Sequence, residues 1–272
     1  MSDNIWLCIE HLYARLDIKT ALIITSYNWP EALDLVLSTV ANQHVMPDYI
    51  VIADDGSDER THDVIGLWKG NLPLRHIWQS DSGFRAARVR NLAALKSDAE
   101  HLVFIDGDCL LPPSFIENHR NLVRPGLAIA GSRYLLNRRR TLDLVNGSGK
   151  ISGTAFFHPK FMNIPLGILR DTRPHAWHTF RSCNFGLMSA DFFASYGFDE
   201  AYKGWGREDS DLIVRMLNLG LAIRSGRLAT CVLHLDHPSH DRKALKNNNY
   251  RFSRVISDDS ISRPVTTSLG EL

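Results

Sequence analysis

Polar and acidic side chains stand directly after three short apolar runs in the first half of the sequence. The runs cover residues 20–25, 49–53 and 101–105. If they are neighbouring parallel strands, their carboxyl ends share one edge of a sheet, where open sheets of this kind bind ligands. Carboxylates gathered at one edge repel each other unless a cation joins them. We therefore expect a ligand site built from the side chains that follow the runs: Thr25, Tyr27, Asn28, Asp54, Asp55, Asp106, Gly107 and Asp108.

The pair Asp106 and Asp108 is the sharpest signal of this group. Alternate residues of an extended segment point the same way and lie roughly 6.5 Å apart. One carboxylate can then bind a divalent cation while the other meets a water or a ribose, and Gly107 lets a phosphate approach the backbone. Oxygen ligands completed by substrate phosphates suit Mg²⁺ or Mn²⁺. The alternatives are a polar turn at a strand end and, for Asp55 and Ser57, capping of the next helix.

A second acidic group lies downstream in Gly204-Trp205-Gly206-Arg207-Glu208-Asp209. The helix dipole favours acids in a first turn, which is one explanation of the carboxylates. It does not explain two glycines around a tryptophan, because glycine lowers helix stability and an exposed tryptophan needs a reason. A carboxylate beside an aromatic platform suits deprotonation of a bound sugar hydroxyl. We expect Asp209 and Glu208 to be catalytic, and Trp205 and Gly206 to contact the acceptor.

Histidines and arginines supply candidate partners for a cation and a diphosphate. His234 and His237 follow an apolar run at residues 229–233, and an imidazole arriving at the same edge would complete a metal site with Asp108. We expect His237, or else His234, to be that ligand. Arginines at positions 85, 88 and 90 begin a helix, and guanidinium groups pair bidentately with phosphate oxygens. Arg85, Arg90 and the adjacent Asn91 are therefore expected at the diphosphate, with a solvated basic face as the alternative.

The elements that position these residues follow from the apolar pattern. The three runs and a fourth at 74–78 are almost continuously apolar, which suits parallel strands covered on both faces. Helical patterns lie between them: one carries apolar residues at 33, 36, 37 and 40, with Asn28 as its expected N-cap, and the next begins at residues 57–59. Residues 18–125 therefore predict a βαβαβαβ unit with right-handed crossovers.

The second half is less regular. Residues 137–178 contain the run Arg138-Arg139-Arg140, several glycines and prolines and no clear period, which predicts a loop-rich insertion. Order returns at 182–190 and in a helix from Glu208 that should end at Gly220. After about residue 240 we expect a basic, then Ser/Thr-rich tail with a mobile end. The expected organisation is one α/β domain at 1–240, with halves at 18–125 and 126–240, and a tail at 241–272.

Composition excludes several classes of protein. The 272 residues carry a net charge of +1 and 44% hydrophobic residues, which argues against a disordered chain. Near-zero charge removes the attraction that nucleic-acid binders use, so no nucleic-acid partner is expected. The four cysteines are widely spaced, which predicts reduced thiols and, with no signal peptide, a cytoplasmic protein. No window is apolar enough to span a bilayer, so only peripheral membrane contact is expected.

The order of these motifs resembles glycosyltransferase family 2, which has the GT-A fold, over residues 18–240. The resemblance rests on five segments: Ile24-Thr-Ser-Tyr-Asn28, Val51-Ile-Ala-Asp-Asp-Gly-Ser57, Arg88-Val-Arg-Asn91, Val103-Phe-Ile-Asp-Gly-Asp108 and Gly204-Trp-Gly-Arg-Glu-Asp209. The last segment and Gly83-Phe84 also look like bacterial chondroitin-polymerase modules. They are similar as well to the carboxyl-terminal segments of galactosyltransferases and polypeptide N-acetylgalactosaminyltransferases. The implied fold is a mostly parallel, Rossmann-like sheet flanked by helices, with a small acceptor-side subregion.

The resemblance implies metal-dependent transfer of a sugar from a UDP-sugar, with inversion, to a hydroxyl of a glycan or glycolipid. Bacterial surface polysaccharide or lipopolysaccharide synthesis is the implied setting. Thr25, Tyr27 and Asp55 would hold uracil and ribose, and Asp106 and Asp108 would bind ribose and the metal-diphosphate. His237 or His234 would complete the site of a Mn²⁺ or Mg²⁺ ion. Asp209 would be the general base, with Glu208 orienting the acceptor and Trp205 forming a wall of its pocket.

Three other functions compete with this hypothesis. A phosphohydrolase or phosphomutase also uses two aspartates at a strand end, but normally after the first strand and with a partner lysine. A nucleotide-sugar pyrophosphorylase would need a glycine-rich loop followed by a lysine near the first strand. A non-catalytic nucleotide- or sugar-binding module is the alternative from a different class.

The basic residues 242, 243, 246, 251 and 254 could meet an anionic acceptor or lipid headgroups, or be merely solvated.

Overall fold

The apolar runs of the first half form one half of an eight-stranded sheet, with β3 (Leu74–Trp78) at its edge. A computed structural model describes residues 18–147, 149, 172–173, 177–238 and 241–269. Its sheet has the order β3-β2-β1-β4-β9-β6-β10-β8. The strands are β1 (Thr20–Ser26), β2 (Tyr49–Asp54), β3 (Leu74–Trp78), β4 (His101–Asp106), β6 (Leu127–Ala130), β8 (Thr172–Arg173), β9 (Asn184–Met188) and β10 (Ala222–Ser225).

The predicted parallel arrangement is confirmed for the first four strands. β1 pairs in parallel with β2 and β4, and β2 pairs in parallel with β3. The direction then reverses, because β9 is antiparallel to both β4 and β6. β10 is parallel to β6 and antiparallel to β8. The sheet is therefore mixed, and its parallel part brings the ends of β1, β2 and β4 to one edge.

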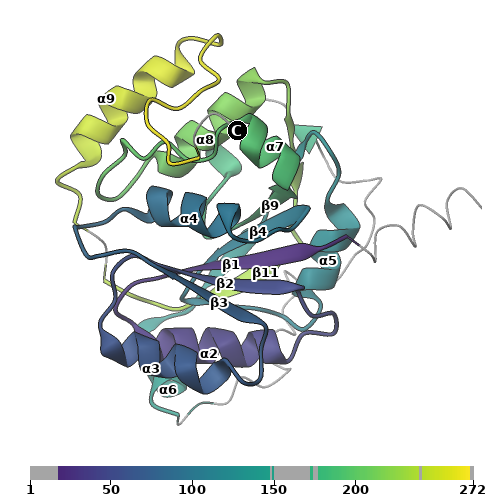
Figure 1. The fold of residues 1–272 in the computed structure, drawn as a ribbon, viewed down its shortest axis with the longest axis vertical. Helices are drawn as coiled ribbons and strands as arrows, with labels where there is room; N and C mark the ends of the chain where they lie inside the picture. The colour runs from purple at the N-terminus through teal and green to yellow at the C-terminus, as the bar shows by residue number, and fades with distance from the viewer. Residues whose placement is uncertain (1–17, 148, 150–171, 174–176, 239–240, 270–272) are drawn as a thin grey trace, which may run out of the picture.

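Helices cover both faces of this sheet (Figure 1). α2 and α3 lie on one face, and α4 lies on the other together with α7 and α8. The helices are α2 (Pro30–Ala41), α3 (Glu59–Trp68), α4 (Ala86–Leu95), α5 (Phe115–Leu122), α6 (Arg138–Val145), α7 (Ser189–Ala194), α8 (Glu208–Asn218) and α9 (Leu245–Ile256), with a 3₁₀ turn at Trp177–Thr179. No helix in the described part of the chain has both the length and the apolar composition needed to cross a membrane.

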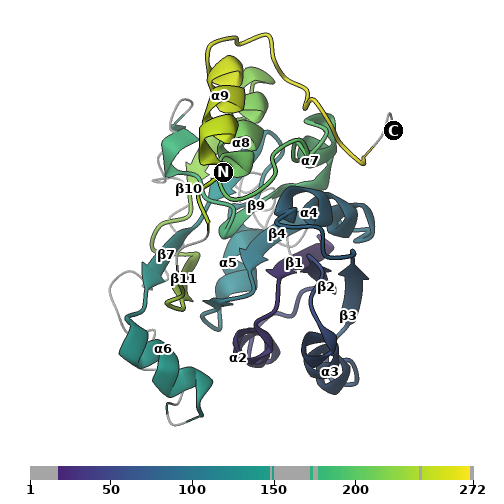
Figure 2. The same ribbon diagram turned by 90° about the vertical axis from the view of Figure 1, so that its left-hand side faces the viewer.

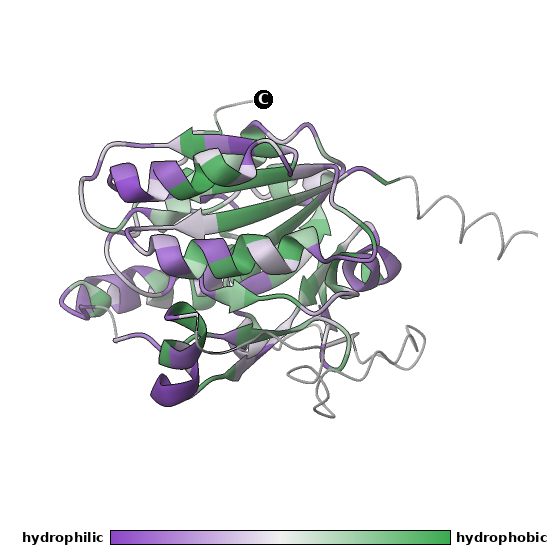
Figure 3. Ribbon diagram, turned by 90° about the horizontal axis from the view of Figure 1, so that it is seen from below, coloured by the Kyte–Doolittle hydropathy of each residue, from purple (hydrophilic) through white to green (hydrophobic). Residues whose placement is uncertain are grey.

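The two-sided cover explains the continuous apolar character of the strands. Leu22 and Ile24 pack into the core layer beneath α2, while Ile23 between them packs into the opposite layer with α4 and α8. Phe104 belongs to the second layer and stacks on Phe185 with ring centroids 4.5 Å apart. Figure 3 shows the result as apolar strands enclosed by helices that carry hydrophilic residues. Because both faces are buried, the strands do not alternate polar and apolar residues.

A small second sheet lies beside the first and has the order β5-β11-β7. It is formed by β5 (Cys109–Leu110), β7 (Ser132–Leu135) and β11 (Cys231–His234). β11 runs antiparallel to β5 and pairs His234 with Cys109. This pairing carries residues from the last quarter of the chain to the segment that follows β4. The strand expected at 229–233 is therefore present but begins two residues later.

One local expectation is wrong. Trp29, not Asn28, is the N-cap of α2, and the Asn28 carboxamide oxygen instead accepts from the backbone N–H of Asp58 at 2.9 Å. The expected N-terminus of α3 is confirmed, with Asp58 as its cap. The insertion expected at 137–178 contains α6, capped by the Asn137 side chain. Most of the remainder of that insertion lies outside the described residues.

Residues 241–269, expected to form a basic and then Ser/Thr-rich tail, pack on the domain. α9 lies along α8 and buries Phe252 and Val255 against Val214 (Figure 2). The segment 257–269 then returns to the core, where Leu269 is buried. The segment packs there because it contains three hydrophobic side chains, Phe252, Val255 and Leu269. They are buried against residues that are distant in the sequence. The residues after 269 lie outside the described part of the chain.

Candidate active site at the carboxyl edge of the sheet

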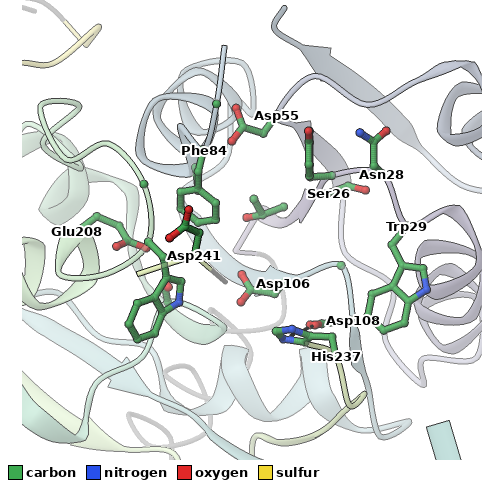
Figure 4. A pocket seen from close by; sticks show the side chains of 18 of the residues that line it. Ser26, Asn28, Trp29, Asp55, Phe84, Asp106, Asp108, Glu208, His237 and Asp241 are labelled. Atoms are coloured by element: carbon green, nitrogen blue, oxygen red, sulfur yellow. Dashed lines mark ion pairs between the residues drawn. The ribbon is translucent and has the colours of Figure 1, made fainter. Parts of the chain in front are cut away.

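A cavity of about 710 Å³ opens at the edge where β1, β2 and β4 end. Its walls come from both halves of the chain, as Figure 4 shows. The lining side chains that carry chemistry are Thr25, Tyr27, Asn28, Asp55, Arg90, Asp106, Asp108, Trp205, Glu208 and His237, and the wall also includes Gly107. Most of the residues expected at one edge of the sheet are therefore brought together.

Tyr27 and Asp55 form one end of the cavity. The Tyr27 side chain is 52% exposed, and its hydroxyl donates to Asp81 Oδ2 at 3.0 Å, which raises the pKa of the phenol. The Asp55 carboxylate is buried and accepts from the backbone N–H of Arg85 at 2.6 Å and from the Gln79 amide. Burial raises the pKa of Asp55 against these bonds. A fixed carboxylate beside an exposed aromatic ring can bind a nucleobase and a ribose.

Arg90 lies at the base of the cavity and joins its two sides. The side chain is 3% exposed, and its guanidinium donates to Thr25 Oγ1 at 3.0 Å and to Asp106 Oδ1 at 2.9 Å. A third, longer contact of 3.5 Å reaches Glu208 Oε1. The positive charge therefore offsets carboxylates from β4 and from α8 at once. Arg90 is already occupied by these partners, so it would act on a diphosphate only as a nearby charge.

Asp108, His234 and His237 form a cluster at another part of the cavity. His234 Nε2 lies 3.6 Å from Asp108 Oδ1, and His237 Nε2 lies 3.4 Å from Asp108 Oδ2. Each histidine has its Nδ1 2.8 Å from a backbone carbonyl oxygen, of Leu235 and Pro238 respectively. A carbonyl only accepts, so each Nδ1 carries a hydrogen, and each ring turns its Nε2 to the carboxylate. Such an arrangement favours a cation between the three groups, so the residues present fit the divalent metal that the motifs imply.

Glu208 and Trp205 form the wall that comes from the second half of the chain. Glu208 is buried, and its Oε2 has no hydrogen-bond partner among the described residues. Burial and the neighbouring Asp209 raise the pKa of Glu208 to about 7. Gly204 has φ +71°, and a Cβ there would stand 2.6 Å from that of Ala244. Only glycine therefore allows the Trp205 loop to lie this close to the segment that leads into α9.

A family model described as glycosyl transferase family 2 matches residues 21–191. The chain belongs to glycosyl transferase family 2. A second model, described as the N-terminal domain of galactosyltransferase, matches residues 170–238, which include Trp205, Glu208 and His237. The two matches together cover the cavity walls up to Pro238.

Curated relatives of this glycosyltransferase are longer proteins. A validoxylamine A glucosyltransferase of Streptomyces hygroscopicus subsp. limoneus is 28% identical over 227 residues, which is 76% of this chain and 49% of the relative. The chondroitin synthase of Escherichia coli is 25% identical over 256 residues, which is 84% of this chain and 37% of the synthase. The chain thus spans about half of the first relative's length and less of the second.

Solved structures share the fold. The S. aureus TarS fragment 1–349 in complex with UDP-GlcNAc has a TM-score of 0.60 at 15% identity and is matched over 90% of this chain and 68% of that chain. The mannosyltransferase PcManGT from Pyrobaculum calidifontis, in complex with GDP-Man and Mn²⁺, has a TM-score of 0.59 at 16% identity, over 89% and 65%. The expected GT-A fold is thereby confirmed.

Several expected site residues of the glycosyltransferase lie away from the cavity wall. The Asp54 carboxylate accepts from the backbone N–H of Ser57 at 2.8 Å and lies 3.0 Å from His76 Nε2. Although burial raises its pKa, these bonds lower it below the usual value. The Asn91 amide donates to the Phe198 carbonyl oxygen at 2.9 Å, and the Arg85 guanidinium donates to the Ser80 carbonyl oxygen.

The pair expected to be catalytic, Glu208 and Asp209, is divided in a similar way. Asp209 and Gly206 do not line the cavity, although their neighbours Glu208 and Trp205 do. Asp209 Oδ2 accepts from the backbone N–H of Ser182 at 3.3 Å. Gly107 lines the cavity, but its lack of a side chain has another cause: a Cβ there would stand 2.7 Å from the Thr25 carbonyl oxygen. Packing of β4 on β1 therefore requires the glycine.

Other lining residues were missed by the sequence reasoning. They are Ser26, Trp29, Gly83, Phe84, Ala86, Ser182, Gly204, Pro238, Asp241, Lys243 and Ala244. Asp241 and Lys243 lie at the start of the segment expected to be a tail, which is why they were not assigned to the site. Cys109 was counted only as a reduced thiol, although its position directly after Asp108 was a readable signal.

Proposed function

We propose that this family 2 enzyme is an inverting, metal-dependent glycosyltransferase. It would move a sugar from a UDP-sugar to a hydroxyl of a glycan or glycolipid, in the synthesis of a bacterial surface polysaccharide or lipopolysaccharide. The observation that carries the proposal is the Asp108, His234 and His237 cluster, with two imidazole Nε2 atoms facing one carboxylate. Relatives solved with UDP-GlcNAc, and with GDP-Man and Mn²⁺, support a nucleotide-sugar donor and a divalent metal.

The donor would lie between Tyr27 and the Asp108 cluster. Asp55 would accept hydrogen bonds from the base or ribose, and Asp106 would bind the ribose. A Mn²⁺ or Mg²⁺ ion held by Asp108 with His237 or His234 would stabilise the negative charge that develops on the departing diphosphate. Arg90 would add to that stabilisation as a fixed positive charge at the cavity base.

The acceptor would approach from the Trp205 wall. We propose that Asp209 accepts the proton of the attacking hydroxyl while Glu208 orients it. Glu208 lines the cavity and Asp209 does not, so variants of both decide the roles. Asp209→Asn should abolish transfer and leave UDP affinity nearly intact. If Glu208→Gln abolishes transfer and Asp209→Asn retains it, the base is Glu208.

Metal-linked nucleotide binding tests the proposal without an acceptor. With Mn²⁺ present and UDP near a hundred times its dissociation constant, UDP should stabilise the fold by roughly 2.7 kcal/mol. Asp108→Ala should lose most of that shift in a thermal denaturation experiment. An unchanged melting curve of the native protein would contradict both the proposed binding of UDP and the proposed binding of the metal.

A non-catalytic nucleotide- or sugar-binding module is the competing proposal. It predicts the same stabilisation by UDP but no turnover. A screen of UDP-sugars for UDP release, with and without candidate glycan acceptors, separates the two. Release that requires an acceptor supports transfer, and no release with any UDP-sugar supports the module.

We also propose a cytoplasmic setting with peripheral membrane contact through basic side chains of the α9 region. Lys246, Arg251 and Arg254 on α9 and Arg242 and Lys243 before it would meet anionic headgroups. Replacing Lys246, Arg251 and Arg254 by glutamine should reduce binding to vesicles that contain anionic lipid, while α9 keeps its packing through Phe252. Equal vesicle binding by the variant would overturn this part.

A further inference from the structure

A thiol lies next to the metal-binding cluster. Cys109 follows Asp108 directly and is fully buried. Its Sγ lies 3.6 Å from Asp108 Oδ1, the same oxygen that faces His234 Nε2 at 3.6 Å. The donor atoms of Asp108, Cys109 and His234 all lie within 4.8 Å of one another. The pairing of β5 with β11 holds this arrangement, because it sets His234 opposite Cys109.

The separations of Cys109, His234 and His237 from Asp108 match those of a four-ligand metal site, although the group whose donor atoms all lie within 4.8 Å of one another comprises Asp108, Cys109 and His234 and does not include His237. Tetrahedral zinc has ligands at about 2.0–2.3 Å, so its donor atoms stand roughly 3.3–3.8 Å apart. The contacts of Asp108 with Cys109, His234 and His237 measure 3.6, 3.6 and 3.4 Å. One carboxylate, one thiol and two imidazoles form a donor set typical of zinc rather than of magnesium.

We propose that Cys109 is a fourth protein ligand of this site and makes it bind thiophilic divalent ions such as Zn²⁺ and Co²⁺. This inference rests on the cation site of the proposed function. On coordination the sulfur–metal bond forms and the thiol proton passes to solvent. Four protein ligands complete a tetrahedral shell and leave no position for a diphosphate. Zn²⁺ therefore inhibits the Mn²⁺-dependent reaction, in which phosphate oxygens complete the shell.

The surroundings of the thiol leave it available to the metal. Cys109 has a second thiol, Cys183, within hydrogen-bond reach on its other side. Arg133 Nη1 donates to Cys183 Sγ at 3.6 Å. These contacts engage Cys183, while the Cys109 sulfur faces Asp108. Cys231 is also buried and lies on β11, but it is not part of the donor cluster, so it serves as a matched control.

The test is absorption spectroscopy of the full chain titrated with Co²⁺ in the absence of nucleotide. The native protein should show visible Co²⁺ bands and a near-ultraviolet sulfur-to-cobalt charge-transfer band. Cys109→Ser should lose the charge-transfer band and weaken Zn²⁺ binding by about tenfold or more. Cys231→Ser should keep both, and melting curves of the two variants establish that they fold.

The outcomes separate the two proposals. Co²⁺ binding without a charge-transfer band in the native protein overturns the role of Cys109 and leaves the cation site intact. No Co²⁺ binding by calorimetry overturns the cation site of the proposed function together with this inference. A charge-transfer band that survives in Cys109→Ser also overturns it. Relief of Zn²⁺ inhibition in Cys109→Ser, but not in Cys231→Ser, supports it.

Discussion

Glu208 combines burial with a place in the cavity wall, and its charge state is set by that burial and by charged neighbours. Burial and Asp209 raise its pKa to about 7, while Arg90 opposes them. Below this pKa the carboxyl is neutral, and above it the carboxylate can accept a hydrogen bond from an acceptor hydroxyl. We predict that kcat/KM rises with pH through about 7. A pH–rate profile of the native enzyme measures it.

The Glu208→Gln variant is the control for that profile. If the rise reports Glu208, the variant should have lower activity and no inflection near 7. An inflection that persists at the same pH would assign it to another group. UDP binding by the variant should stay close to that of the native protein, because the contacts we assign to the donor do not include Glu208.

Two buried histidines, His101 and His119, should make the stability of the fold depend on pH. Burial lowers the pKa of His119 to about 3 and lowers that of His101 well below its ordinary value. The folded state therefore holds both neutral, while the unfolded chain binds protons near pH 6.5, so stability is lost as the pH falls below that value. At pH 5 the loss should reach about 2 kcal/mol per histidine.

Urea unfolding at pH 7.5 and pH 5.0 checks this prediction. His119→Gln should lose about half of the pH dependence. His62→Gln, at an exposed position, should keep all of it. Equal stability of the native protein at the two pH values would contradict the prediction.

At the scale of elements, α9 holds the Trp205 wall of the cavity in place. The Asn248 amide is buried and donates to the backbone carbonyl oxygens of Gly206 at 2.9 Å and Lys203 at 3.2 Å. These carbonyls flank Trp205. We predict that Asn248→Ala raises the KM for the acceptor severalfold and lowers stability by about 1–3 kcal/mol, because it leaves the carbonyls without their donor. UDP affinity should not change.

Steady-state kinetics with the acceptor varied, together with UDP titration, measures both effects. Asn247→Ala is the matched control, since Asn247 is the exposed neighbour on the same helix. If both variants behave like the native enzyme, α9 does not position the Trp205 loop. If UDP affinity falls with acceptor affinity, the effect is a general loss of packing.

The sequence alone predicts the elements whose characteristic pattern lies within their own residues. Strands buried on both faces are continuously apolar. α8 ends at Asn218, and Gly220 shortly after it has the left-handed conformation that the sequence predicts for a helix end, with φ +88°. α9 could not be predicted in the same way, because its few apolar residues become informative only when α8 is known to lie beside it. Long-range contacts of this kind leave no periodic pattern in the segment itself.

The same limit applies to the site. Asp54 and Asp55 are adjacent in the sequence, but successive residues of an extended segment point to opposite sides, so only one carboxylate reaches the cavity. Residue order alone does not say which. Glu208 and Asp209 differ for a related reason, since neighbours on a helix point about 100° apart. The approach of His234 to Asp108 depends on the pairing of β11 with β5, and β5 has only two residues, which is too short to recognise beforehand.

At the scale of the whole molecule, the net charge is near zero, but the charged side chains are distributed unevenly over the structure. Carboxylates from β2, β4 and α8 meet in one cavity and Arg90 lies among them, so the site is built from both halves of the chain. The segment 257–269 packs against another part of the domain. Asp199 accepts from the backbone N–H groups of Val265 and Thr266, both at 3.1 Å, and holds the segment 257–269 on the core.

Leu269 anchors this returning segment in the core layer that includes Phe192. It is 3% exposed, whereas Val265 in the same segment is 71% exposed. We predict that Leu269→Ala lowers the free energy of unfolding by about 2–5 kcal/mol, because it removes a buried side chain and leaves a cavity. Val265→Ala should change it by less than about 0.5 kcal/mol. Urea denaturation of the two variants tests this, and an equal effect would mean that the returning segment contributes no core packing in solution.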